Sequence, residues 1–203
     1  ESAYRRYQKE CLDLPFDKGV AYPFVRRLLK LNLAYPELSP IEVIVLSRND
    51  PDSGQRFFRS CRHYGLDITR GAFLEGKSPH PYIPAFNASL FLSANESDVT
   101  SAISAELPAG LVLPTQAVDS DEGDELRVAF DFDGVIADDE SEAVFQKDTN
   151  NVSLFHDHEQ EKRDKPHNPG PLADLIKKLS VFQRWERQHV AKTEGAKRLL
   201  RIA

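Results

Sequence analysis

A short apolar run that stops at a pair of aspartates constrains this chain more than any other feature of its sequence. Residues 126–130 are apolar except for Arg127, and the sequence D-F-D-G follows at residues 131–134. The run predicts a short buried strand. Because alternate residues of a strand share a face, we expect Asp131 and Asp133 to leave its carboxyl end in the same direction. The glycine that follows them lets the backbone turn.

Two carboxylates at the end of a strand are suited to bind a hard divalent cation such as Mg²⁺. A cation there would also bind a phosphate oxygen, so that one aspartate attacks phosphorus while the other donates and withdraws a proton. An EF-hand loop is an alternative, with Glu140 at its twelfth position. Its first position would then be Ala129, which offers no ligand, and the preceding segment is a predicted strand instead of a helix. A plain acidic turn is a further alternative.

The motif resembles the first motif of the haloacid dehalogenase superfamily of phosphatases, in which an apolar strand precedes D-x-D-G. More narrowly, the whole chain is similar to the cytosolic 5′-nucleotidase I type family and its bacterial relatives. This similarity covers nearly all of the 203 residues. The segments that carry it include Y-R-R-Y-Q, P-F-V-R-R-L-L, V-L-S-R-N, H-Y-G-L-D-I, G-K-S-P, L-F-L-S-A-N, R-V-A-F-D and G-P-L.

The resemblance implies a phosphoric monoester hydrolase, an Mg²⁺-dependent 5′-nucleotidase that converts nucleoside 5′-monophosphates to nucleoside and phosphate. Asp131 would form an aspartyl-phosphate, and Asp133 would protonate the leaving 5′-oxygen and then activate water. Mg²⁺ would be held by the Asp131 carboxylate and the Asp133 backbone carbonyl. Asp138, Asp139 and Glu140 are candidates for a loop that contacts the substrate or supports the metal ligands.

Two further residues match phosphate-binding motifs of the same superfamily. Ser47 follows the apolar run 41–46, as the hydroxyl residue of the second motif does. Lys77, in G-K-S-P, resembles the lysine of the third motif, which stabilises the phosphate charge. A helix cap by Asp52 or Ser53 is the alternative for the loop after Ser47, and a solvated loop is the alternative for Lys77.

The fourth superfamily motif is not matched. Where the family has paired acids after a strand, this chain has Ser93 and Asn95, with only Asp98 nearby. This part of the chain is therefore not expected to be an independent catalytic unit.

Alternating apolar strands and amphipathic helices predict an α/β fold with a mainly parallel, haloacid dehalogenase-like sheet flanked by helices. Ligand should bind beyond the carboxyl ends of the strands. In the second helix, Arg26, Arg27 and Lys30 are expected to form the solvated face. The expected helices are 1–12, 22–33, 55–64, 98–105, 139–147 and 172–184, and the expected strands are 41–46, 88–92, 110–113 and 126–130.

The second part of the chain echoes the first at an offset of 151 residues, as in the pairs Tyr4 and Phe155, Pro15 and Pro166, and Gly19 and Gly170. This self-similarity predicts two related halves, although chance similarity is an alternative. The predicted units are a degenerate half at 1–117, a mobile acidic linker at 118–125 and a catalytic half at 126–203. In that case Ser47 and Lys77 would belong to a pseudo-enzyme half that shapes the nucleoside pocket or the contact between halves.

Two features lead us to expect an incomplete chain. It contains no Met, even at position 1, and residues 201–203 resemble a strand cut at its start. The catalytic half would therefore be truncated at its carboxyl end.

Composition argues against nucleic-acid and membrane partners. A net charge of −6 provides no basic surface for nucleic acid, and no run of about 18 apolar residues occurs. Cys11 and Cys61 lack the spacing of a metal site or a disulfide framework, and each is expected to be a packed thiol. They fit a reducing cytoplasm.

Three other functions stay open. The chain could belong to a sugar-phosphate phosphatase, to a phosphotransferase that passes phosphate to a nucleoside, or to a non-catalytic nucleotide-binding protein. The preferred base and sugar are not determined by the sequence, and a homo-oligomer is left open.

Overall fold

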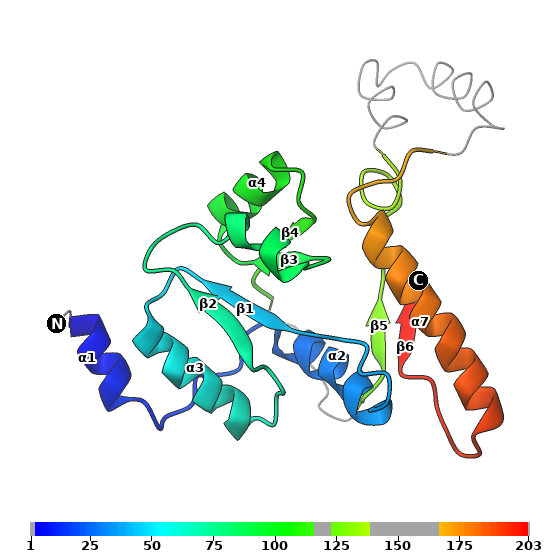
Figure 1. Ribbon diagram of the computed structural model, residues 1–203, viewed down its shortest axis with the longest axis horizontal. Helices are drawn as coiled ribbons and strands as arrows, with labels where there is room; N and C mark the ends of the chain where they lie inside the picture. Colours follow the sequence, from blue (N-terminus) through cyan, green and yellow to red (C-terminus); the bar gives the residue numbers. More distant parts are fainter. Residues whose placement is uncertain (1–2, 116–122, 139–166, 203) are drawn as a thin grey trace.

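The computed structural model describes residues 3–115, 123–138 and 167–202 (Figure 1). Its helices are α1 (Ala3–Glu10), α2 (Tyr22–Ala34), α3 (Pro51–His63), α4 (Glu96–Ser104), α7 (Ala173–Lys192) and the short 3₁₀ helices η1 (His80–Tyr82) and η2 (Pro84–Phe86). Its strands are β1 (Ile44–Ser47), β2 (Arg70–Phe73), β3 (Phe91–Ser93), β4 (Ala109–Leu111), β5 (Leu126–Val128) and β6 (Leu200–Ile202).

The α/β class predicted from the sequence is confirmed. The helices expected at 1–12, 22–33, 55–64, 98–105 and 172–184 are present with shifted bounds. The four expected strands are also present, and each is shorter than expected. The helix expected at 139–147 lies outside the described residues, as do Asp139 and Glu140.

All described strands pair in parallel, but they form three two-stranded sheets instead of one continuous sheet. The pairs are β1 with β2, β3 with β4, and β5 with β6. A helix connects the strands of the first two pairs, α3 between β1 and β2 and α4 between β3 and β4, because parallel neighbours need a crossover connection. Sequence periodicity predicts strands but does not specify their neighbours, and the single expected sheet was therefore wrong for the described residues.

The largest buried cluster joins α2 to the β5–β6 pair and α7. In Figure 1, α7 runs beside β5 and β6 in orange and red, and the blue helix α2 approaches the start of β5. Because α2 contributes side chains to this buried cluster, the helix is part of the core that supports β5. The buried members of the cluster are Leu31, Tyr35, Leu126, Phe182 and Leu200.

A buried carboxylate links the same elements by hydrogen bonds. Glu186 of α7 is fully buried and accepts a hydrogen bond from the Tyr35 hydroxyl at 2.9 Å. It also accepts from the backbone N–H of Leu199 at 2.8 Å and of Leu200 at 3.4 Å. Tyr35 and Glu186 are 151 residues apart, the interval of the internal repeat, while the division into two related halves stays a prediction.

The described end of the acidic linker is held by α2. Arg26 and Arg27 donate hydrogen bonds to the Gly123 carbonyl at 3.1 and 3.0 Å, and the Lys30 ammonium lies 3.7 Å from the Asp124 carboxylate. The expected solvated face of α2 was wrong for Arg26, whose side chain is only 15% exposed. At this end of the linker cationic side chains meet an acidic segment, while the expected mobility of the linker stays a prediction. Residues 118–122 lie outside the described residues.

No helix in the described ranges has the length and apolar character that a membrane crossing requires.

Candidate functional site

The D-F-D-G residues lie beyond the end of β5, in irregular backbone. β5 ends at Val128, so Asp131 follows the strand after two further residues and Asp133 lies in a turn. The expectation that strand alternation orients both carboxylates was therefore wrong. Both side chains are nonetheless exposed at the carboxyl end of the strand, the edge at which parallel α/β units bind ligands.

A single carbonyl organises the loop that carries the two aspartates. The Phe132 oxygen accepts hydrogen bonds from the backbone N–H groups of Ile136 at 2.9 Å and Ala137 at 3.0 Å. Gly134 has a φ of +69°, a conformation that a residue with a Cβ rarely adopts. The Asp131 carboxylate accepts from the Phe132 N–H at 2.8 Å. The glycine of the motif thus permits one tight turn directly after the first aspartate.

Asp138 lies at the far end of this loop. Its Oδ2 atom accepts a hydrogen bond from the Asn168 amide at 2.7 Å. Its Oδ1 atom is buried without a hydrogen-bond donor among the described residues, and His167 Nδ1 lies 3.9 Å from it. The structure thus places three predicted site residues, Asp131, Asp133 and Asp138, on one loop.

The exposed carboxylates fit the donor type that Mg²⁺ prefers. Mg²⁺ is commonly bound through one or two carboxylates, with waters and substrate phosphate completing its shell. Asp131 and Asp133 provide such oxygen atoms. Within ranges 3–115, 123–138 and 167–202, no group of three or more His, Cys, Asp or Glu side chains could hold a metal ion.

Ser47 and Lys77 lie at the end of a different sheet. The hydrogen bond from the Leu74 N–H to the Ser47 carbonyl, at 2.9 Å, joins the last residue of β1 to the loop that follows β2. The Ser47 hydroxyl accepts from the Asn49 N–H at 3.1 Å, and the Lys77 side chain is exposed. Among the described residues, no hydrogen bond or ion pair connects this pair to the D-F-D-G loop. The structure therefore brings Ser47 close to the segment of Lys77, but groups neither with Asp131.

An ion pair between the partly exposed Arg48 and the buried Asp98 lies beside Ser47. Arg48 Nε donates to both carboxylate oxygens of Asp98, at 2.9 and 3.0 Å, and Arg48 Nη1 donates to the Gly76 carbonyl at 3.2 Å. The Ser78 hydroxyl donates to Asp98 Oδ1 at 3.1 Å. Asp98 is only 4% exposed. The hydrogen bond from Arg48 is the main cause that lowers the pKa of Asp98, and it outweighs the opposing effect of burial.

Sequence reasoning missed the role of Arg48. The available signals were its position directly after Ser47 and the isolated Asp98 where paired acids were absent. The two residues are 50 positions apart, so only the tertiary structure reveals that they form a pair.

The loop after β1 also caps α3. The Asp50 carboxylate accepts a hydrogen bond from the Ser53 N–H at 2.9 Å, and this bond is the main cause that lowers the pKa of Asp50. The sequence alternative of a helix cap in this loop is thus confirmed, but the assignment to Asp52 or Ser53 was wrong. A carboxylate there satisfies an N–H group that the first turn leaves unpaired.

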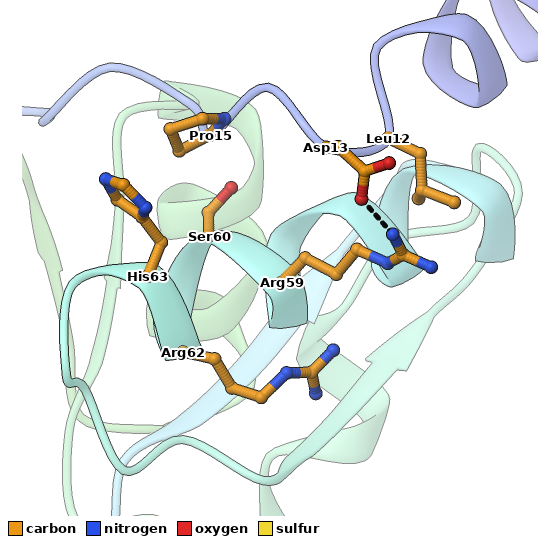
Figure 2. A pocket seen from close by; sticks show the side chains of 7 residues that line it. All are labelled: Leu12, Asp13, Pro15, Arg59, Ser60, Arg62 and His63. Carbon is orange, nitrogen blue, oxygen red and sulfur yellow. Dashed lines mark hydrogen bonds and ion pairs between the residues drawn. The ribbon is translucent and has the colours of Figure 1, made fainter.

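A cavity of about 440 Å³ lies between α3 and residues 12–15, and no predicted site residue lines it. Figure 2 shows Arg59 turned toward Asp13, with which it forms an ion pair, while Arg62 extends away from both. The two arginine side chains therefore do not converge on a common point in the cavity. Its lining residues are Leu12, Asp13, Pro15, Arg59, Ser60, Arg62 and His63.

Comparison with known proteins gives a consistent assignment. A family model described as 5′-nucleotidase matches residues 1–203. The human protein named cytosolic 5′-nucleotidase 1B is 29% identical over 186 residues, which cover 89% of this chain and 30% of that protein. The chain thus spans about a third of the length of this relative. No solved structure matches the chain.

Proposed function

Because the chain belongs to the 5′-nucleotidase family, we propose that it forms part of an enzyme that hydrolyses nucleoside 5′-monophosphates to nucleoside and phosphate. The observation that carries this proposal is the D-F-D-G loop, which presents two exposed aspartates at the carboxyl end of β5. Carboxylates at such an edge can supply both a nucleophile and a proton carrier to a bound phosphate ester.

In the proposed reaction Asp131 attacks phosphorus through a carboxylate oxygen. A bond forms between this oxygen and phosphorus, and the bond from phosphorus to the 5′-oxygen breaks. Asp133 donates the proton that the leaving 5′-oxygen needs. It then withdraws a proton from water, which attacks the aspartyl-phosphate at phosphorus, releases inorganic phosphate and restores Asp131.

Mg²⁺ is the proposed cofactor, held by the Asp131 carboxylate and the Asp133 backbone carbonyl. When bound, it would neutralise negative charge on the phosphoryl group. The exposure and oxygen chemistry of both residues support this assignment. Asp138, Asp139 and Glu140 remain candidates for residues that surround the substrate.

We place Ser47 and Lys77 outside this catalytic centre. Their position at the end of the β1–β2 pair, beside the Arg48–Asp98 ion pair, supports the proposal that residues 1–117 form a degenerate half. In this proposal the segment 118–125 links it to the catalytic residues from 126 onward. The human relative is named cytosolic, and we propose the same compartment for this protein.

Phosphate release by the full-length protein tests the proposed function. Nucleoside monophosphates and sugar phosphates are compared, with and without Mg²⁺, for wild type, Asp131→Asn and Asp174→Asn. Asp174 is the matched control, because it is an exposed aspartate of α7 that pairs, among the described residues, with Lys178 alone. Mg²⁺-dependent release from nucleotides that only Asp131→Asn abolishes supports the proposal.

Each of three other results would replace the proposed function with a different one. Release from sugar phosphates alone keeps the chemistry and rejects the nucleotide substrate. Phosphate transfer to an added nucleoside, in preference to water, indicates a phosphotransferase. Nucleotide binding without release of phosphate from any substrate indicates a binding protein.

A further inference from the structure

The segment 167–172, which leads into α7, packs along the D-F-D-G loop. Figure 1 shows this orange segment beside the yellow-green loop above β5. Residues Ala137 and Pro169 form an antiparallel bridge between the two. We refer to residues 167–172 as the clamp segment.

Backbone hydrogen bonds join the clamp segment to the loop at three points. The Asp138 N–H donates to the Asn168 carbonyl at 2.9 Å, and the Gly170 N–H donates to the Ile136 carbonyl at 2.8 Å. The Leu172 N–H donates to the Val135 carbonyl at 3.0 Å. These bonds connect every second residue of the clamp segment to the part of the loop that follows Asp133.

One side-chain bond strengthens this contact. The Asn168 amide donates to Asp138 Oδ2 at 2.7 Å, and because the acceptor is a carboxylate, this bond is stronger than one between neutral groups. The His167 ring meets the Phe132 ring edge-on, with 5.7 Å between the ring centres. The residue between the two aspartates is thus also in contact with the clamp segment.

Gly170 permits an approach that no other residue would allow. A Cβ atom at this position would lie 2.3 Å from the Ala137 carbonyl oxygen and 2.7 Å from the Val135 carbonyl oxygen. Both atoms belong to the backbone of the loop, so relief of the overlap requires movement of the backbone itself. The absence of a side chain at residue 170 therefore fixes the distance between the loop and the clamp segment.

The clamp segment is itself attached to a rigid element. The Ala173 N–H donates to the Gly170 carbonyl at 3.1 Å, at the start of α7. Further along α7, Phe182 and Glu186 are buried in the core that contains β5 and β6. The loop is therefore held at one end by β5 and at the other by α7.

We propose that Gly170 and Asn168 are positioning residues that set the place of Asp131 and Asp133 for catalysis. This inference rests on the proposed function, because it assigns the loop a reaction to serve. Displacement of the loop by about 1 Å would misplace a nucleophile enough to lower the rate on the order of 100-fold. Substrate affinity would change much less, because replacing Gly170 removes no group that touches the substrate.

The first test compares Gly170→Ala with Gly19→Ala in the full-length protein. Gly19 is the matched control, since a Cβ there would meet no atom within 4 Å. The measurements are kcat and KM for a nucleoside monophosphate and amide hydrogen exchange of the peptide that contains residues 131–138. For Gly170→Ala we expect kcat to fall on the order of 100-fold with KM within a few-fold, and faster exchange in the loop. The control should match wild type in all three.

The second test reverses donor and acceptor in the hydrogen bond between Asn168 and Asp138. Asn168→Asp places two carboxylates side by side and should loosen the loop and lower kcat. Combining it with Asp138→Asn restores a hydrogen bond, now donated by residue 138 and accepted by residue 168. We expect the double variant to regain slow exchange in the loop. The effect on kcat is read from Asn168→Asp alone, because Asp138 is itself a candidate site residue.

The outcomes separate the two proposals. Unchanged loop exchange in both Gly170→Ala and Asn168→Asp overturns the clamp, and faster exchange with unchanged kcat overturns its positioning role. If Gly170→Ala also loses protection in α3, it has unfolded, and the double variant Asn168→Asp with Asp138→Asn decides. Recovery of slow exchange in the loop supports the clamp, and its absence overturns it. If wild type releases no phosphate, the proposed function fails, and Gly170 and Asn168 then have no reaction to position.

Discussion

At the scale of single residues, Asp98 provides the clearest electrostatic prediction. Replacement by Asn removes the charged acceptor of Arg48 and Ser78 from a buried site. We expect Asp98→Asn to lower the free energy of unfolding by about 1–3 kcal/mol at pH 7. Urea unfolding of the full-length protein measures the difference, with Asp174→Asn as the exposed control that should stay close to wild type.

The same substitution has a defined pH dependence. Folding lowers the pKa of Asp98, so its stabilising effect is complete above the usual aspartate pKa of about 4 and disappears as the pH falls through the lower, folded-state pKa. The difference in Tm between wild type and Asp98→Asn should therefore be constant from about pH 7 to pH 5 and should shrink below about pH 4. A difference that grows on acidification would contradict this account.

Cys61 should be an inert thiol. Burial raises its pKa to about 11, so the reactive thiolate is scarce at pH 8. In a Cys11→Ser background, we expect iodoacetamide to label Cys61 in the folded protein at least about tenfold more slowly than in urea. Mass spectrometry of the timed reaction gives both rates, and equal rates would show that the thiol is accessible and ionised.

The residue-scale part of the site was only partly predictable. The D-F-D-G motif located Asp131 and Asp133 after a strand, because that signal lies in consecutive residues. Their orientation was not predictable, because a turn held by the Phe132 carbonyl replaces the last strand residues. The Arg48–Asp98 pair was not predictable either, since sequence spacing carries no information on a contact across 50 residues.

At the scale of elements, Glu186 should join α7 to α2 and β6. Glu186→Ala leaves two backbone N–H groups of residues 199 and 200 and the Tyr35 hydroxyl without their acceptor. We expect a loss of about 2–4 kcal/mol in unfolding free energy, against about 1 kcal/mol for Tyr35→Phe, which removes a single bond. Equal losses in urea unfolding would show that the backbone bonds of Glu186 contribute nothing.

Element identity followed from sequence periodicity, whereas element boundaries did not. α2 and α7 have apolar residues at helical spacing, and both helices were identified, although α7 extends to Lys192, well beyond the expected end at residue 184. The start of α3 was misplaced because Asp50, Asp52 and Ser53 are all good capping residues, and only Asp50 has the extended backbone that directs its carboxylate to the Ser53 N–H. Strand pairing was not predictable, because each pair forms across an intervening helix.

At the scale of the molecule, the core crosses the proposed boundary between halves. Tyr35, which directly follows α2, contacts Phe182 and Trp185 of α7, with ring centres 5.7 and 5.0 Å apart. Leu31 of α2 lies in the same buried cluster as Leu126 and Leu200. The strand that presents the D-F-D-G loop is therefore supported by a helix from residues 1–117. We expect loss of this contact, and not only changes near Asp131, to disturb the site.

The identity of the phosphorylated residue tests the central claim most directly. The full-length protein is mixed with a nucleoside monophosphate and Mg²⁺, quenched in acid during turnover and reduced with borohydride, which converts an aspartyl-phosphate to homoserine. The account predicts homoserine at position 131 in wild type and none in Asp131→Asn. Homoserine at another position, or none at all in a protein that is hydrolysing nucleotide, would contradict the assignment of Asp131 as the nucleophile.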